Sequence, residues 1–253
     1  MSPLVLVLMA SLPSSFSWCD PGDGGFSQCT PVKDQGSCSG CWAYATAAVV
    51  ENLMYLADSS TVPDVSEKHL LENNPWGWSC ELGGGRAFDM YVDGGVVLED
   101  GSEVDVHVAR WVSLGVAPTI EAIKSAIIEH GPVWTAVYAD RAFQNYKGGV
   151  FHGTRTTVQH AVVLVGWDNS EGVWILRNSY GPNWGDQGYM KIAYGANAVG
   201  FWATWVELEG EDPTPVTGCS TGFDGTSWVT LILVLTFLRG YVTFGTWNTP
   251  NKT

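Results

Sequence analysis

Two cysteines lie in a short segment rich in Gly and Ser, residues 35–42, the part of the sequence best suited to nucleophilic chemistry. Cys41 directly precedes a run of good helix formers, so we expect a helix to begin at or near this residue. At a helix N-terminus, unpaired backbone N–H groups and the helix dipole stabilise a thiolate and can lower the pKa of the thiol. Cys41 is therefore a candidate nucleophile.

The pair Cys38 and Cys41 also has three other interpretations. Two residues separate them, a spacing typical of a redox pair, of half a zinc site, or of two buried structural cysteines. A zinc site needs a second paired cluster, and the other cysteines, at positions 19, 29, 80 and 219, are scattered. This segment alone does not decide between nucleophile, redox pair and structural cysteines.

A Cys nucleophile needs a base, and the base needs a group that orients it, both within hydrogen-bond reach in space. Of the five histidines, His160 alone directly precedes a strong pattern for a buried strand. Asn178 follows another strand pattern, in a loop rich in Gly, Asn and aromatic residues. A histidine at a strand start and an asparagine in a turn are each common structural residues, so their partnership with Cys41 is a hypothesis.

The elements that must position these side chains change in type along the chain. Helical patterns occur at residues 41–56, 64–72, where Ser66 is a candidate N-cap, 86–92 and 120–130. Residues 96–115 mix loop and strand. Runs of β-branched and aromatic residues then occur at 132–138, 161–167, 173–177 and 188–194. The sequence predicts a helical lobe, then a strand-rich lobe, with a cleft between them.

The composition limits the classes of partner. The chain has 253 residues, 45% of them hydrophobic, which is enough for a substantial core. The formal net charge is −14, and no basic run with interleaved aromatics occurs, so we expect no nucleic-acid binding. Six cysteines fit an oxidising compartment if some of them pair. Cys19 and Cys29 bracket a Gly-rich loop at a separation suited to a local disulfide.

Both ends of the sequence differ from its middle. Residues 1–11 resemble a secretory signal, with an apolar run at 4–10, although a remnant of a longer upstream segment has the same pattern. Residues 210–253 comprise a linker and an apolar stretch, 228–238, which is short of the ~20 residues of a membrane-spanning helix. Small residues at 218–220 hint at a lipid anchor. We expect instead a packed or disordered extension, with Cys219 the odd cysteine.

Several motifs, spread over residues 12–207, decide between these interpretations. They are residues 30–38, 41–43, 80 with 83–84, 131–133, 143–151, 160–167 and 178–185. In this order they resemble the papain-like, or cathepsin-like, family of cysteine peptidases. His160 and Asn178 follow Cys41 by 119 and 137 residues, near the ~130–150 typical of that family.

The resemblance implies a fold. It is the α+β papain-like fold, with a helical N-terminal lobe at about residues 12–115, an antiparallel, β-barrel-like C-terminal lobe at about 116–209, and the active-site cleft between them. It also implies a disulfide between Cys38 and Cys80, which accounts for the spacing of Cys38 and Cys41 without redox chemistry.

The resemblance also implies roles for the candidate catalytic residues. Cys41 would be a thiolate paired with the imidazolium of His160, which later protonates the leaving amine. Asn178 would orient the His160 ring, and Trp184 would cover these two residues from water. Gln35 and the backbone N–H of Cys41 would form the oxyanion hole. No cofactor or metal is needed.

The same matching implies substrate-binding residues. Gly83 and Gly84 would pair with the backbone of an extended substrate. Ala136, Val158 and Ala161 would line the pocket for the substrate residue two before the cleaved bond (P2). That pocket should prefer apolar side chains.

The chain departs from the family pattern at Ser39, where a Gly is usual beside the cleaved bond, and at Tyr180, where a Trp usually follows the Asn-Ser pair. The family's mature start, matched at residue 12, follows the apolar run almost directly, which indicates either a form without an inhibitory propeptide or a truncated sequence. We expect a cysteine endopeptidase. The alternatives are a catalytically silent peptide-binding protein and an acyl transferase that uses the same site.

The expected partners are a protein or peptide substrate and proteinaceous inhibitors of cysteine peptidases. We expect a monomer with no membrane attachment, secreted to the outside of the cell or held in a lysosome-like compartment.

Overall fold

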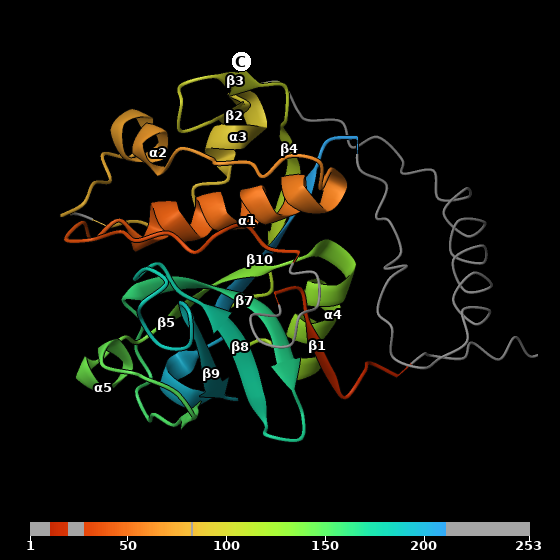
Figure 1. Cartoon of the computed structure of the whole chain (residues 1–253), viewed down its shortest axis with the longest axis vertical. Helices are drawn as coiled ribbons and strands as arrows, with labels where there is room; N and C mark the ends of the chain where they lie inside the picture. Colours follow the sequence, from red (N-terminus) through yellow and green to blue (C-terminus); the bar gives the residue numbers. More distant parts are fainter. Residues whose placement is uncertain (1–10, 20–27, 82, 211–253) are drawn as a thin grey trace, which may run out of the picture. The chain divides into compact units, whose positions relative to one another are not determined.

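A computed structural model describes residues 11–19, 28–81 and 83–210 of the chain (Figure 1). The chain divides into two units, Met1–Pro213 and Thr214–Thr253. The second unit lies outside the described residues, as do residues 1–10 of the expected signal and 211–253 of the expected tail. All the described residues belong to the first unit.

Helix α1, Cys41–Ala57, carries the candidate nucleophile at its first position, which confirms the predicted helix start. Its small alanines at 43, 45 and 47 are buried and allow close packing on both sides. Figure 1 shows α1 between the large sheet and a group of short elements. These elements are α2, Glu67–Asn73, α3, Asp89–Asp93, and the paired strands β2, Val96–Val97, and β3, Glu103–Val104. The Ser66 side chain caps α2 by accepting from His69 N, as predicted.

The large sheet has eight strands among the described residues. Its order is β4-β10-β5-β7-β8-β9-β6, with β1 paired to β7. The bounds are β1 Ser15–Ser17, β4 Val108–Ser113, β5 Val133–Val137, β6 Val150–Phe151, β7 His160–Asp168, β8 Val173–Arg177, β9 Tyr189–Ala193 and β10 Phe201–Leu208. The expected strand-rich region is therefore present, and the fold class is α+β.

Two details of the expected strand-rich lobe differ in the structure. The sheet is mixed rather than antiparallel, because β6 and β9 run parallel. Nor do the described strands close into a barrel, since the path ends at β4 on one side and at β6 on the other. Strand pairing between distant segments decides this closure, and no local pattern in the sequence reports it.

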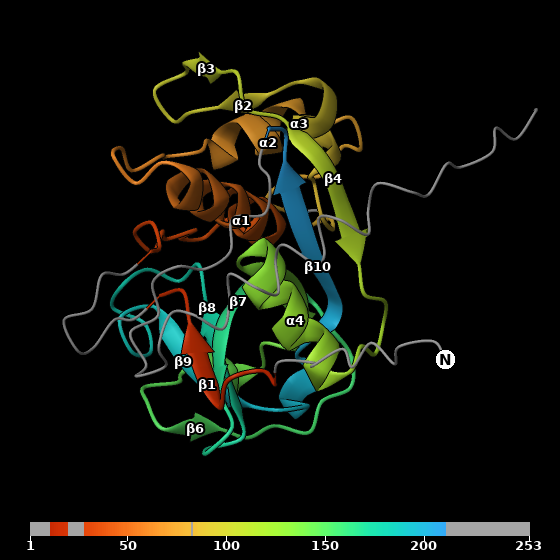
Figure 2. The same ribbon diagram turned by 90° about the vertical axis from the view of Figure 1, so that its right-hand side faces the viewer.

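The strands β5 and β7 form the buried centre of the sheet. All five residues of β5 are buried, and so are eight of the nine in β7. A continuous apolar run of this kind is typical of a strand covered on both faces. Figures 1 and 2 show α1 and α4, Ile120–His130, packed against this sheet. Helix α4 has the predicted bounds, and the Thr119 side chain caps it by accepting from Ala122 N.

The first part of the chain also contributes strands to the large sheet. Strand β1 pairs with β7, and β4, from residues expected to mix loop and strand, pairs with β10. Figure 2 shows β4 and β10 running from the sheet past α1 towards α3. The boundary near residue 115 therefore separates the helical from the strand-rich sequence, whereas strands from both parts build the sheet.

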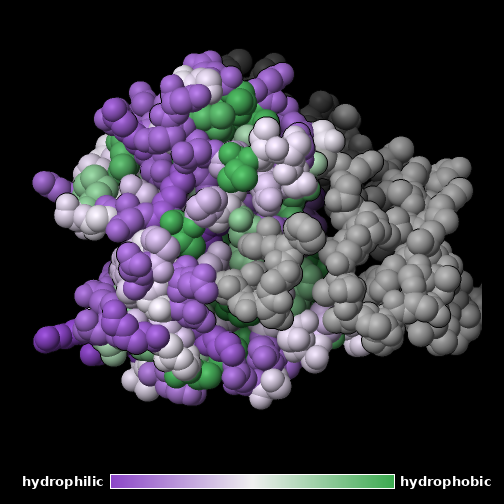
Figure 3. Space-filling model, viewed as in Figure 1, coloured by the Kyte–Doolittle hydropathy of each residue, from purple (hydrophilic) through white to green (hydrophobic). Residues whose placement is uncertain are grey.

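Two disulfides join the described cysteines, Cys38 to Cys80 and Cys19 to Cys29, and Cys41 is a free thiol. On the face shown in Figure 3, hydrophobic residues lie in scattered patches among hydrophilic ones. Within residues 11–19, 28–81 and 83–210, no helix has the length and apolarity needed to cross a bilayer.

Candidate active site

The sheet brings His160 and Asn178 together. His160 is the first residue of β7, and Asn178 directly follows β8, which pairs with β7 in antiparallel register. The start of one strand therefore lies beside the end of the other. His160 Nε2 and Asn178 Oδ1 are 2.8 Å apart, and the two residues are only 6% and 4% exposed.

The hydrogen bonds of Asn178 fix which ring nitrogen of His160 carries a proton. Ser179 N, which can only donate, contacts the same Asn178 atom at 2.9 Å, so that atom is the amide oxygen. An oxygen acceptor requires a proton on His160 Nε2. In the neutral ring, Nδ1 is then left as the basic nitrogen.

Aromatic rings surround this hydrogen bond. Tyr180 stacks on the His160 ring with centroids 4.9 Å apart and planes 27° apart. Phe143 meets the same ring edge-on at 6.0 Å. Trp184 packs against both Tyr180 and Phe143, and its Nε1 donates to Gln144 O at 2.9 Å. The rings limit the access of water to the imidazole, and Tyr180 does so despite standing where a Trp is usual.

Burial opposes charge on either candidate reacting group. It lowers the pKa of His160 to about 4, although the hydrogen bond to Asn178 acts in the opposite direction. Burial also raises the pKa of the Cys41 thiol, against the backbone amides of Ala161, Trp42 and Cys41 itself. The expectation of a lowered thiol pKa from the helix N-terminus is therefore wrong in its net direction, because desolvation outweighs the amides.

The effect of the Ala161 amide also locates the thiol. Ala161 directly follows His160 in β7, so the sulfur of Cys41 lies at the start of that strand. Burial raises the pKa of the Tyr180 phenol to about 12, and a negative charge on Cys41 would act in the same direction. The candidate nucleophile and the candidate base thus share one location between α1 and the sheet.

Gln35 lies on a segment that pairs with the loop after Asn178. Gln35 N donates to Ser179 O at 2.9 Å, and Gly181 N donates to Lys33 O at 3.1 Å. The Gln35 side chain is held at both ends, since Nε2 donates to Cys38 O at 2.6 Å and Oε1 accepts from Ser179 Oγ at 2.6 Å. An amide nitrogen has two hydrogens, so the bond to Cys38 uses only one of them.

The two candidate substrate-binding glycines are exposed beside the Cys38–Cys80 disulfide. A Cβ at Gly84 would collide with the indole of Trp78, so this close approach requires glycine. At Gly83 a Cβ would meet only ordinary contacts, with Trp42 and the carbonyl of Ser39.

Of the three candidate pocket residues, the structure pairs two. Ala136 in β5 lies opposite Ala161 in β7 in the register of the sheet, and both are buried. Val158 is half-buried and lies just before β7. Two small side chains therefore lie side by side on one face of the sheet.

Sequence reasoning gave no role to Ser179, whose hydroxyl holds Gln35, or to Phe143, which packs on His160. Ser179 adjoins Asn178, and neighbouring side chains in an extended segment point to opposite sides. That alternation would have directed Ser179 away from His160, but only the pairing with the Gln35 segment shows what it meets.

Comparisons with known proteins agree with the motifs. The sequence model of one protein family, papain family cysteine protease, matches residues 12–206. The oryzain beta chain of Oryza sativa subsp. japonica is 33% identical over 209 residues, covering 74% of this chain and 44% of that protein. Papaya proteinase 4 of Carica papaya is 33% identical over 202 residues, covering 73% of this chain and 56% of that protein.

Two solved structures show the same fold. A digestive procathepsin L2 proteinase from Tenebrio molitor larval midgut has a TM-score of 0.70 and 29% identity, covering 78% of this chain and 69% of that one. The bromelain protease from Ananas comosus, solved in complex with the E64 inhibitor, has a TM-score of 0.65 and 26% identity, covering 78% and 100%. The chain spans about half the length of the oryzain beta chain and of papaya proteinase 4. With a match over residues 12–206 and this fold, the chain belongs to the papain family of cysteine proteases.

Proposed function

We propose that this protein is a cysteine endopeptidase, with Cys41 as nucleophile and His160 as proton carrier. The observation that carries the proposal is the buried hydrogen bond between His160 Nε2 and Asn178 Oδ1, beside a free thiol at the N-terminus of α1. This bond leaves Nδ1 of His160 for proton exchange with the thiol.

The reaction follows from these positions. Cys41 gives its proton to His160 Nδ1, and the thiolate attacks the substrate carbonyl. The oxyanion that forms accepts hydrogen bonds from Gln35 Nε2 and the backbone N–H of Cys41. His160 then protonates the leaving amine, the C–N bond breaks, and a thioester remains. Water attacks the thioester, His160 takes its proton, and the thiol is restored with release of the acid.

We also propose that the substrate binds as an extended strand. The exposed backbone of Gly83 and Gly84 is open to pairing with it. Ala136, Ala161 and Val158 would accept an apolar side chain at P2, because no polar atom of their side chains needs a partner. The two disulfides favour an oxidising compartment, either outside the cell or in a lysosome-like lumen.

Covalent labelling tests the proposal. The protein, with its disulfides intact, is treated with the epoxide E-64, and the modified residue is located by mass spectrometry. We expect one label on Cys41, none on Cys41→Ala, and thiol-dependent cleavage of a fluorogenic peptide with an apolar P2 residue that the variant lacks. A folded protein without label at Cys41 would overturn the proposal in favour of the binding-only alternative.

A second arm separates hydrolysis from acyl transfer. The peptide is cleaved in the presence of a competing amine, and the products are identified by mass. The free acid as main product supports a peptidase. An amide as main product at low amine concentration would identify an acyl transferase with the same nucleophile.

A further inference from the structure

Lys33 has four acceptors around its ammonium group. Nζ lies 2.6 Å from Glu51 Oε1, 2.7 Å from Asp64 Oδ1 and 2.9 Å from Glu67 Oε1, and it donates to Val65 O at 2.8 Å. Glu51 belongs to α1, Glu67 begins α2, and the other two residues lie between these helices. A single side chain therefore ties its segment to the helix that begins with the nucleophile.

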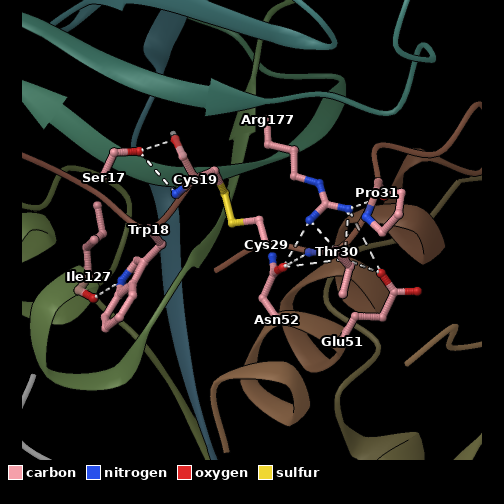
Figure 4. Close-up of a disulfide and its surroundings, with 10 residues drawn as sticks. All are labelled: Ser17, Trp18, Cys19, Cys29, Thr30, Pro31, Glu51, Asn52, Ile127 and Arg177. Atoms are coloured by element: carbon pink, nitrogen blue, oxygen red, sulfur yellow. Dashed lines mark hydrogen bonds and ion pairs between the residues drawn. A yellow bond between two sulfur atoms is a disulfide. The ribbon is translucent and has the colours of Figure 1, made fainter. Parts of the chain in front are cut away.

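The same segment is held from the side of the sheet by Arg177, the last residue of β8. Its guanidinium donates to Thr30 Oγ1 at 3.1 Å, to Pro31 O at 2.7 Å and to Asn52 Oδ1 at 3.1 Å. It also lies 3.9 Å from Glu51 Oε2. Figure 4 shows the guanidinium pointing towards Thr30, Pro31 and the Glu51 carboxylate. Arg177 directly precedes Asn178, so the segment is fixed to the strand of the candidate orienting residue as well.

Glu51 is the common partner of both cations. It is fully buried, and its oxygens also accept from Thr30 Oγ1 at 2.9 Å and from Val65 N at 2.9 Å. Burial lowers the pKa of Lys33, but the charges of Glu51 and Glu67 outweigh it and hold the pKa above its usual value. The ammonium therefore stays charged. A buried ion pair of this kind resists separation, because removing one partner leaves an uncompensated buried charge.

The segment so anchored carries Gln35, two residues after Lys33. Lys33 O accepts from Gly181 N, and Gln35 N donates to Ser179 O. Both partners lie just after Asn178, so the backbone from residue 33 to residue 35 has little freedom. We propose that Lys33 is a positioning residue for Gln35: by fixing this segment to α1, it sets the distance between Gln35 Nε2 and the Cys41 thiol that oxyanion stabilisation requires. Lys33 itself touches no substrate. This inference rests on the proposed function.

The geometric demand is strict. Oxyanion donors act at 2.7–3.1 Å, and a displacement of ~1 Å can cost ~10²-fold in rate. Loss of the Lys33 anchor should therefore impair acyl transfer far more than it impairs the thiol. Alkylation of Cys41 by iodoacetamide provides the comparison, because the sulfur forms a bond to carbon as iodide leaves and no oxyanion develops. A general structural defect would lower both rates together.

The experiment uses the whole chain with three single variants. Lys33→Met removes the charge and keeps the length, and Lys33→Arg keeps the charge. Lys191→Met is the control, because Lys191 makes an exposed pair with Glu171 at 2.6 Å on β9. We expect Lys33→Met to lower kcat for peptide hydrolysis about 10- to 100-fold with little change in KM, since the loss falls on the transition state. Its alkylation rate should stay within about twofold of the unmodified protein.

The two other variants test whether the loss of kcat is specific to removal of the charge at position 33. Lys33→Arg should recover most of kcat, and Lys191→Met should match the parent protein in both assays. Lys33→Met removes the cation shared by Asp64 and Glu67 and leaves Glu51 with Arg177 as its cation. The double variant Lys33→Met/Glu67→Gln therefore carries the test if the single variant does not fold. A cooperative thermal unfolding transition shows that a variant is folded.

The proposal is overturned if hydrolysis and alkylation fall in parallel in a folded variant. It is also overturned if neither falls, or if Lys33→Arg is as impaired as Lys33→Met. Failure of the proposed function has a different signature, because the parent protein would then show neither hydrolysis nor labelling at Cys41.

Discussion

Replacing Asn178 by Ala removes the hydrogen bond that orients the candidate base. The variant loses the acceptor that lies 2.8 Å from His160 Nε2 and 2.9 Å from Ser179 N. The aromatic rings of Tyr180 and Phe143 still contact the imidazole, so the ring should remain in place. The variant therefore isolates the effect of the hydrogen bond on the charge and orientation of the ring.

The size of the effect follows from the two states of His160. A hydrogen bond to a charged group contributes roughly 1.5–3 kcal/mol and one between neutral groups roughly 0.5–1.5 kcal/mol. The imidazolium therefore loses about 1–1.5 kcal/mol more than the neutral ring, which is about one pKa unit at ~1.36 kcal/mol per unit. This agrees in sign with the hydrogen bond, which raises the pKa of His160. The alkaline limb of kcat/KM, where the imidazolium loses its proton, should move about one unit lower.

The assay is the pH dependence of kcat/KM for a fluorogenic peptide, measured for the parent protein and for Asn178→Ala. Asn73→Ala is the matched control, because its exposed amide bonds only within its own helix, to His69. Its profile should coincide with that of the parent. An alkaline limb that stays in place or moves to higher pH in Asn178→Ala would refute the assigned role of Asn178.

Two further predictions concern the surroundings of the site. Ser179→Ala removes the donor to Gln35 Oε1. Loss of a hydrogen bond of roughly 0.5–1.5 kcal/mol should lower kcat/KM about 2- to 13-fold. An equal fall in the rate of Cys41 alkylation by iodoacetamide would contradict this prediction. Burial lowers the pKa of His160 to about 4, so His160 lowers the free energy of unfolding as pH falls from about 6.5 to 4. Burial raises the pKa of Glu67 to about 7, so Glu67 increases the free energy of unfolding as pH falls from about 7 to 4.5. In urea unfolding across that range, His160→Gln should gain stability relative to the parent at low pH and Glu67→Gln should lose it, each by up to roughly 3 kcal/mol; shifts of the same sign would contradict the assignment.

Local sequence patterns predicted the elements that carry the site. The start of α1 at Cys41 and the bounds of α4 follow from helix-forming runs, and the Thr119 side chain caps α4. The pairing of β1 with β7 and the parallel pairing of β6 with β9 depend on segments far apart in the chain. No local pattern records such contacts, so the expectation of an antiparallel, barrel-like lobe rests on the family resemblance alone.

The site shows the same division between local and distant causes. Cys41, His160 and Asn178 could be singled out because their types, order and spacing match a known chemistry. The raised pKa of Cys41 could not, because it depends on how deeply β7 and its neighbours bury the thiol. The helix N-terminus favours the thiolate, but it is only one of the opposing effects. The contacts of Lys33 were equally hidden, since its partners lie 18 to 34 residues further along the chain.

The electrostatics of the site favour a reaction that moves charge without creating a net charge. Burial disfavours a thiolate alone and an imidazolium alone, as the shifts of Cys41 and His160 show. Proton transfer between them forms both charges at once, and each charge then stabilises the other at short range in a medium of low polarity. If Cys41 and His160 exchange a proton as proposed, we expect the two groups to titrate as a pair. A change to either partner, including loss of the Asn178 hydrogen bond, should alter the fraction of molecules in the thiolate–imidazolium form. The rate of peptide hydrolysis should then change, whereas the affinity of the site for a neutral peptide need not.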